Sequence, residues 1–255
     1  MKTSNLIKLT LAAVMLLAVT LISRAGILDT PDNPHNFSAR TWNNDPADPN
    51  TVCGVCHVPH HANPNAGPLW GHDLITGGTW KMYANGVSPA ANIKYTPALQ
   101  PNASSMACLS CHDGSVAVNA YGAPNGFART YGTAEFVTNS AAISERNQDL
   151  THSHPISFNY DGIVGNAAGK DKWLWPSGNS VLAPDANSST FTPGNDMTVK
   201  GFLLDQKGNL ECNSCHDVHN QEGSAFDKTL NPHLVKINGT QGGVGSLLCR
   251  SCHNK

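Results

Sequence analysis

Hydrophobic residues occur mostly in short groups, and the one long hydrophobic run lies close to the start of the sequence. Residues 9–22 carry no charge, follow Lys2 and Lys8, and precede a Ser-Arg-Ala sequence with small residues where a signal peptidase cuts. This pattern is typical of a secretory signal peptide over residues 1–25. Because the run is shorter than the roughly 20 residues of a membrane-spanning helix, we expect no membrane span after signal removal. The exported domain then covers residues 26–255.

The other hydrophobic positions predict few and short regular elements. Ala, Leu or Ile at helical spacing favours helices over residues 104–111, 140–147 and 245–253. A Gln-Lys-Gly turn sequence within residues 201–211 favours a small hairpin there. Stretches rich in Asn, Gly, Pro and Ser separate these elements and are typical of loops. We therefore expect a low content of secondary structure.

The composition suggests that side chains alone do not fill the interior. Charged residues make up 13% of the chain, aromatic residues only 7%, and 23 Gly and 16 Pro are present, whereas soluble domains average about 25% charged residues. Part of the 40% hydrophobic content belongs to the N-terminal run. The net charge of −2 disfavours nucleic-acid binding, which needs a basic excess to neutralise phosphates. The 8 Cys and 12 His residues indicate a bound group that takes the place of a larger core.

The Cys residues follow one repeated pattern. Every Cys belongs to a pair separated by two residues, and a His follows each pair directly. This C-x-x-C-H sequence is the signature of covalent haem attachment in c-type cytochromes. The four motifs are Cys53-Gly-Val-Cys56-His57, Cys108-Leu-Ser-Cys111-His112, Cys212-Asn-Ser-Cys215-His216 and Cys249-Arg-Ser-Cys252-His253.

The spacing matches the chemistry of haem c. Two thiols three positions apart reach the two vinyl groups of one porphyrin, and the next residue directs its imidazole at the iron. Disulfides, common in exported proteins, do not require this spacing. Redox-active C-x-x-C sites or zinc sites do not explain a His after every pair. We therefore expect four covalently bound haems, with His57, His112, His216 and His253 as proximal iron ligands.

Enough His residues remain to supply a second ligand to every iron. His is more abundant than Met outside the signal segment, so the composition favours bis-His ligation and low reduction potentials. The eight remaining His are His35, His60, His61, His72, His152, His154, His219 and His233.

Local sequence favours four of these as distal ligands. His60 and His219 each follow a proximal His by three residues, too close to bind the same iron from the opposite face, so each should serve a neighbouring haem. Pro155 holds the backbone of His154 extended and would fix its imidazole. His35, near the start of the exported domain, gains order by binding an iron.

Four other His residues are weaker alternatives. His61 could replace its neighbour His60, and His152 could replace His154. His72 and His233 are expected to be solvated or to bond a haem propionate.

The motifs and their surroundings resemble a known family. The order of the four motifs, Pro68-Leu69-Trp70 after the first and Ser153-His154-Pro155 between the second and third are similar to those of exported multihaem cytochromes c, in particular the tetrahaem OmcE-type filament cytochromes. The resemblance implies a multihaem cytochrome c fold, mostly irregular with a few short α-helices and minimal β structure, wrapped around a stacked tetrahaem core.

The same resemblance suggests how the distal sites are filled. It gives His35, His60, His154 and His219 as distal ligands. In filament-forming relatives one distal His comes from the next subunit, and His35 and His72 are the candidates for that role in this chain.

Two classes of function remain to be compared. An electron carrier needs every iron to be six-coordinate, whereas a multihaem reductase needs an open iron. The His surplus and the absence of a C-x-x-C-K motif favour a carrier without enzymatic activity. We expect an extracellular or cell-surface filament subunit, with a monomeric periplasmic shuttle as the alternative. Its partners would be other copies of itself, other cytochromes, and minerals or electrodes.

Overall fold

The computed structural model describes residues 33–44, 50–75, 78–83, 100–123, 127–138, 142–143, 148–167, 170–181, 197–219, 234–237 and 246–254. The expected signal peptide over residues 1–25, most of the expected helix over residues 140–147, and His233 lie outside these residues. Within them, no helix has the length and hydrophobicity needed to cross a membrane.

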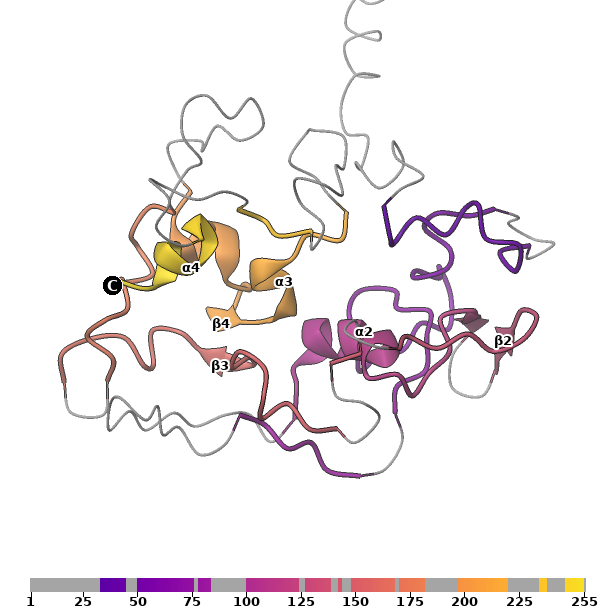
Figure 1. Ribbon diagram of the computed structural model, residues 1–255, viewed down its shortest axis with the longest axis horizontal. Helices are drawn as coiled ribbons and strands as arrows, with labels where there is room; N and C mark the ends of the chain where they lie inside the picture. The colour runs from indigo at the N-terminus through magenta and orange to yellow at the C-terminus, as the bar shows by residue number, and fades with distance from the viewer. Residues whose placement is uncertain are drawn as a thin grey trace, which may run out of the picture.

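Regular structure in the described residues is sparse. The helices are α2 (Ala103–His112), the π-helical turn η4 (Val199–Leu203), α3 (Cys212–Cys215) and α4 (Leu247–Cys252). The strands β1 (Ala120–Ala123) and β2 (Phe127–Thr130) form one antiparallel pair, and β3 (Phe158–Asn159) and β4 (Asn209–Leu210) form another. Turns and loops connect these elements across the fold (Figure 1).

Helices α2 and α4 coincide with two sequence predictions, residues 104–111 and 245–253. Helix α2 ends where Gly114 adopts a positive φ of 72° and donates its N–H to the carbonyl of Cys111, an end that glycine favours because it has no Cβ. The four-residue α3 and the β1–β2 pair were not predicted.

The predicted hairpin over residues 201–211 is wrong. A tight turn is present, because Gly208 donates its N–H to the carbonyl of Asp205 at 2.9 Å. The residues before the turn are helical, however, and β4 pairs with the distant β3. Val199 and Leu203 are both buried while Gly201 between them is exposed, and this pattern fits a helical turn, because a strand would place all three residues on one face.

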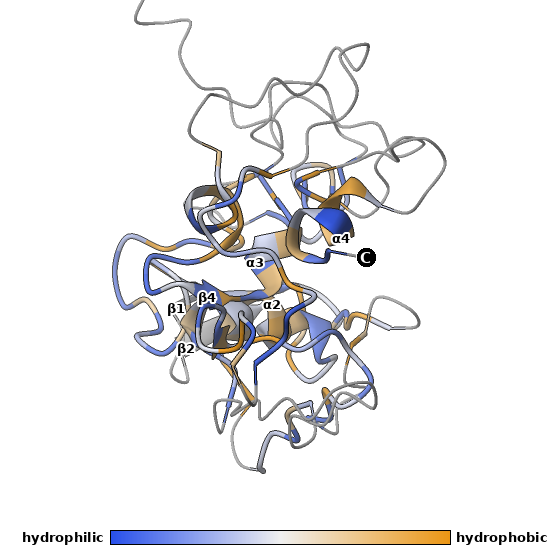
Figure 2. Cartoon of the chain, turned by 90° about the vertical axis from the view of Figure 1, so that its left-hand side faces the viewer, coloured by the Kyte–Doolittle hydropathy of each residue, from blue (hydrophilic) through white to orange (hydrophobic). Residues whose placement is uncertain are grey.

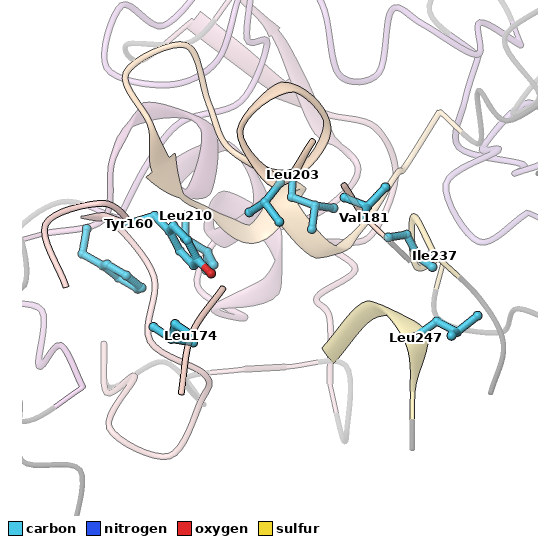
Figure 3. Close-up of a cluster of buried hydrophobic side chains, with 9 residues drawn as sticks. Tyr160, Leu174, Val181, Leu203, Leu210, Ile237 and Leu247 are labelled. Carbon is cyan, nitrogen blue, oxygen red and sulfur yellow. The ribbon is translucent and has the colours of Figure 1, made fainter. Parts of the chain in front are cut away.

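Within the described residues, buried hydrophobic side chains form three clusters. The largest gathers residues from segments far apart in sequence, including Tyr160, Leu174, Leu203 and Leu247 (Figure 3). A second is built around Leu109 on α2, and a third surrounds Tyr121. The first two clusters include residues of the helices α4 and α2, and the third packs against Cys56 of the first motif.

The three helices with Cys motifs follow one another in space. Helix α3 lies between α2 and α4 in Figure 1, and the turned view in Figure 2 also shows the three close together. The second, third and fourth motifs therefore gather at the centre of the fold.

Candidate haem-binding site

Each Cys pair lies on a single helical turn. The N–H of His57 donates to the carbonyl of Cys53 at 2.8 Å, and the fourth motif repeats this bond between His253 and Cys249 at 2.9 Å. In the third motif the N–H of His216 donates to the carbonyl of Cys212 at 3.1 Å, and the second motif lies at the end of α2. One helical turn brings both sulfur atoms and the following imidazole to the same side.

A short extended segment pairs with the His of three motifs. In the first motif the N–H of Val58 donates to the carbonyl of Leu69 at 2.7 Å, and the N–H of Gly71 donates to the carbonyl of Cys56 at 2.8 Å. The third and fourth motifs repeat this arrangement. The bridged residues are His57 with Trp70, His216 with Val235, and His253 with Leu174. We call the segments around Trp70, Leu174 and Val235 the return segments. They fix the backbone position of each of these three motif His residues.

Three pairs of imidazole rings face one another across gaps of similar width. Each pair joins the His of a motif to a His that the sequence predicts as a distal ligand. The ring centroids are 6.0 Å apart for His35 and His112, 6.2 Å for His57 and His219, and 6.4 Å for His154 and His253. His219 thus faces the first motif, rather than its sequence neighbour His216.

The width of these gaps suits two imidazoles bound to one metal ion from opposite sides. Each metal–nitrogen bond is about 2.0 Å, so the two ring centroids should be about 6.3 Å apart. The angle between the ring planes is free to vary about the bond axis, and the observed 41°, 24° and 74° are all compatible. The separation within each of the three pairs therefore fits that of two imidazoles bound to one haem iron.

Hydrogen bonds set the orientation of two of these rings. The Nδ1 atoms of His57 and His154 each lie 2.9 Å from a backbone carbonyl, that of Pro68 and that of Pro155 respectively. A protonated Nδ1 that donates to a carbonyl leaves Nε2 with a free lone pair. Such a bond orients a metal-binding imidazole and increases its basicity.

Burial keeps the imidazole of His35 neutral. Desolvation, with smaller contributions from His112, His219 and His216, lowers the pKa of His35 to about 4. Its Nδ1 is buried without a hydrogen-bond partner. Since a metal binds the neutral form, this environment suits a ligand.

The Cys residues are free thiols, and most are protonated at neutral pH. Burial raises the pKa of Cys56 and of Cys111 to about 12, and that of Cys215 and of Cys252 to about 11. Zinc sites and redox-active C-x-x-C motifs need a stabilised thiolate. In the described part of the chain, no three His, Cys, Asp or Glu residues gather as a metal site. A haem iron needs only two protein ligands.

Thiols of successive motifs influence one another electrostatically. The Cys111 thiol contributes to the raised pKa of Cys56, and Cys215 contributes to that of Cys252. A hydrogen bond between the side chains of Cys108 and Cys212 raises the pKa of Cys108. The first motif is thereby linked to the second, the second to the third and the third to the fourth.

The chain matches no protein-family model and no curated protein. The function proposed below therefore rests on the residues of the site.

Of the predicted distal ligands, His60 is the one that does not lie near another described imidazole. It is exposed, as is its neighbour His61, and it makes no ring contact with another described imidazole. His152 is exposed as well and has no facing imidazole among the described residues. The role of His60 as a distal ligand is therefore still a prediction from the sequence.

His72 is buried, which differs from the expectation of a solvated side chain. It is 1% exposed, with ring centroids 5.5 Å from Trp70 and 6.5 Å from Tyr121. Desolvation lowers its pKa to about 4, although backbone hydrogen bonds at Val55 and Ala120 act in the opposite direction. A side chain so enclosed does not reach a neighbouring copy, and His35 already faces His112 within the same chain.

Sequence reasoning also missed a buried carboxylate beside the third motif. Glu211 has no exposed surface and accepts hydrogen bonds from Asn102, Ser105 and Ser157. The only local signal was an acidic residue directly before Cys212, because the residues that surround it come from distant segments.

Proposed function

We propose that this protein is an electron carrier that binds four haems c covalently and has no enzymatic activity. The observation that carries the proposal is the set of three facing imidazole pairs, each with one member from a C-x-x-C-H motif. A bound haem supplies an iron that takes up and releases one electron.

The chain would hold each haem in a fixed position. The two Cys of a motif would anchor the ring, and paired imidazoles would occupy both axial positions of the iron. The return segments and the carbonyls of Pro68 and Pro155 would orient the ligands. Rigid ligands reduce the rearrangement that accompanies a change in iron charge.

The contacts between motifs support transfer among the four haems. Thiols of neighbouring motifs influence one another, and Cys108 and Cys212 are within hydrogen-bond reach. Haems attached at these positions would lie side by side and form a connected group.

Paired ligands favour a carrier over a reductase. An iron with imidazoles on both faces has no position for a substrate, and His57, His112 and His253 each have a second imidazole at a suitable distance. An open iron at any of the four motifs would instead allow reductase chemistry.

The number of bound haems tests the proposal directly. Intact-mass measurement of protein matured in a host that attaches haem c should exceed the mass of residues 26–255 by four haem masses. Treatment with acidified acetone should not extract them, because thioether bonds are covalent. A mass increase of three haems or fewer in fully matured protein would contradict the proposal.

We further propose that the protein polymerises as a filament subunit, outside the cell or on its surface. His60 is exposed and has no imidazole partner among the described residues. Leu69, beside the first motif, is 54% exposed, and Trp173, beside the fourth, is 47% exposed. Apolar side chains near the first and last motifs suit contacts between copies. The alternative is a monomeric periplasmic shuttle.

Imaging distinguishes the filament from the shuttle. Electron microscopy of concentrated, fully matured protein should show filaments, and Trp173→Ser should shorten or abolish them because a large apolar contact is lost. Phe136→Ser is the control, since Phe136 is also exposed, at 38%, but does not flank a motif. Wild-type protein that stays monomeric at high concentration supports the shuttle instead.

A further inference from the structure

Glu211 is a completely buried carboxylate at the N-terminus of α3. One carboxylate oxygen accepts a hydrogen bond from Nδ2 of Asn102 at 2.5 Å. The other accepts bonds from the hydroxyls of Ser105 at 2.5 Å and Ser157 at 2.8 Å. The backbone N–H of Ser214 also donates to the Glu211 side chain. Its partners belong to three separate segments.

The surrounding groups act as donors to an ionised carboxylate. The Ser105 hydroxyl accepts the N–H of Cys212 at 3.1 Å, and the Ser157 hydroxyl accepts the N–H of Asn102 at 2.9 Å. Each hydroxyl is thus free to direct its own hydrogen at Glu211. All four donors are neutral, so they stabilise the negative charge without cancelling it.

This charge lies between the second and third motifs. Glu211 directly precedes Cys212 of the third motif, and Ser105 lies one turn before Cys108 of the second motif on α2. The hydrogen bond with Cys108 has the largest influence on Cys212 and lowers its pKa. The Glu211 charge acts on the same thiol in the opposite direction. The field of the carboxylate therefore reaches the attachment atoms.

We propose that Glu211 tunes the electron chain by lowering the reduction potential of the haems at the second and third motifs. This inference rests on the proposed haem binding. A buried negative charge favours the oxidised, more positive iron, and burial weakens the screening of that charge by water. Glu211 thus makes an electron at these two haems less stable than it would be without the charge.

The Glu211→Gln variant tests this inference through the potentials themselves. A potentiometric titration followed by haem absorbance should show one or two of the four couples shifted to higher potential. Their ratio of reduced to oxidised haem should rise about tenfold at a given potential, or about 59 mV for a one-electron couple. Glu135→Gln, which removes an exposed charge, should leave all four couples in place.

The outcomes separate this inference from the proposed function. A protein without haem absorbance contradicts the proposed function itself. Four haems with unchanged potentials in Glu211→Gln contradict the tuning role, and a lower melting temperature alone would then mark Glu211 as a structural residue.

A second variant applies if Glu211→Gln does not retain four haems. Ser157→Ala keeps the net charge of the carboxylate but removes one hydroxyl dipole whose positive end points at it and partly offsets its field. The same couples should then shift to lower potential, opposite to the effect of removing the charge. Potentials that do not move in Ser157→Ala would overturn the inference.

Discussion

The His154→Ala variant is expected to bind one equivalent of carbon monoxide rapidly, whereas the wild-type protein binds it slowly or not at all. The ring of His154 faces that of His253 at 6.4 Å, and the carbonyl of Pro155 orients it. Removing this imidazole takes the sixth ligand from one iron and leaves the other three sites intact. Absorbance titration with carbon monoxide and the spin state of the iron provide the measurement.

The His152→Ala variant is the matched control. His152 lies two residues away and is also exposed, but it has no facing imidazole in the part of the chain described. It should behave like the wild-type protein. If His152→Ala binds carbon monoxide and His154→Ala does not, the sequence alternative His152 is the ligand.

Protein made without haem attachment is expected to lose most of its structure. Its helices α2, α3 and α4 have 10, 4 and 6 residues, and isolated helices shorter than about 12 residues are marginal in water. Its sheets have two strands each, which are also marginal by themselves. Far-ultraviolet circular dichroism and limited proteolysis of unmatured chain should therefore report a mainly unfolded protein.

The fully matured protein in the same buffer serves as the reference. It should give helical dichroism and protease-resistant fragments, because each haem adds covalent and ligand bonds between distant segments. A haem-free chain that unfolds in one cooperative thermal transition at a similar temperature would show that side-chain packing is sufficient.

Local features of this protein were predictable from sequence, and non-local ones were not. The helices over residues 103–112 and 247–252 follow from local spacing, and the proximal candidates follow from the motifs. The sequence did not show which two His residues come together, because the approach of His219 to His57 depends on segments that are far apart in sequence. The return segments were not predicted either. In them Leu69 and Leu234 adopt positive φ angles of 55° and 51°, a conformation that leucine rarely takes.

The hairpin error and the position of His72 have a common cause. Residues 206–208 do form a turn, as predicted. The segment before the turn is helical instead of extended, because Val199 and Leu203 pack into a cluster with residues distant in sequence. His72 lies directly between Gly71 and Asp73 in sequence, yet the rings of Trp70 and Tyr121 enclose it. In both cases tertiary contacts outweighed local preference.

The three imidazole pairs divide the chain into overlapping loops. They connect position 35 to 112, 57 to 219 and 154 to 253, and each interval begins before the preceding one ends. A single break of the backbone anywhere between positions 35 and 253 therefore falls inside at least one loop. If a haem iron joins each pair, as proposed above, the two pieces of a nicked chain stay connected. Proteolytic cuts in the exposed connections would leave the assembly whole until the ligands are released.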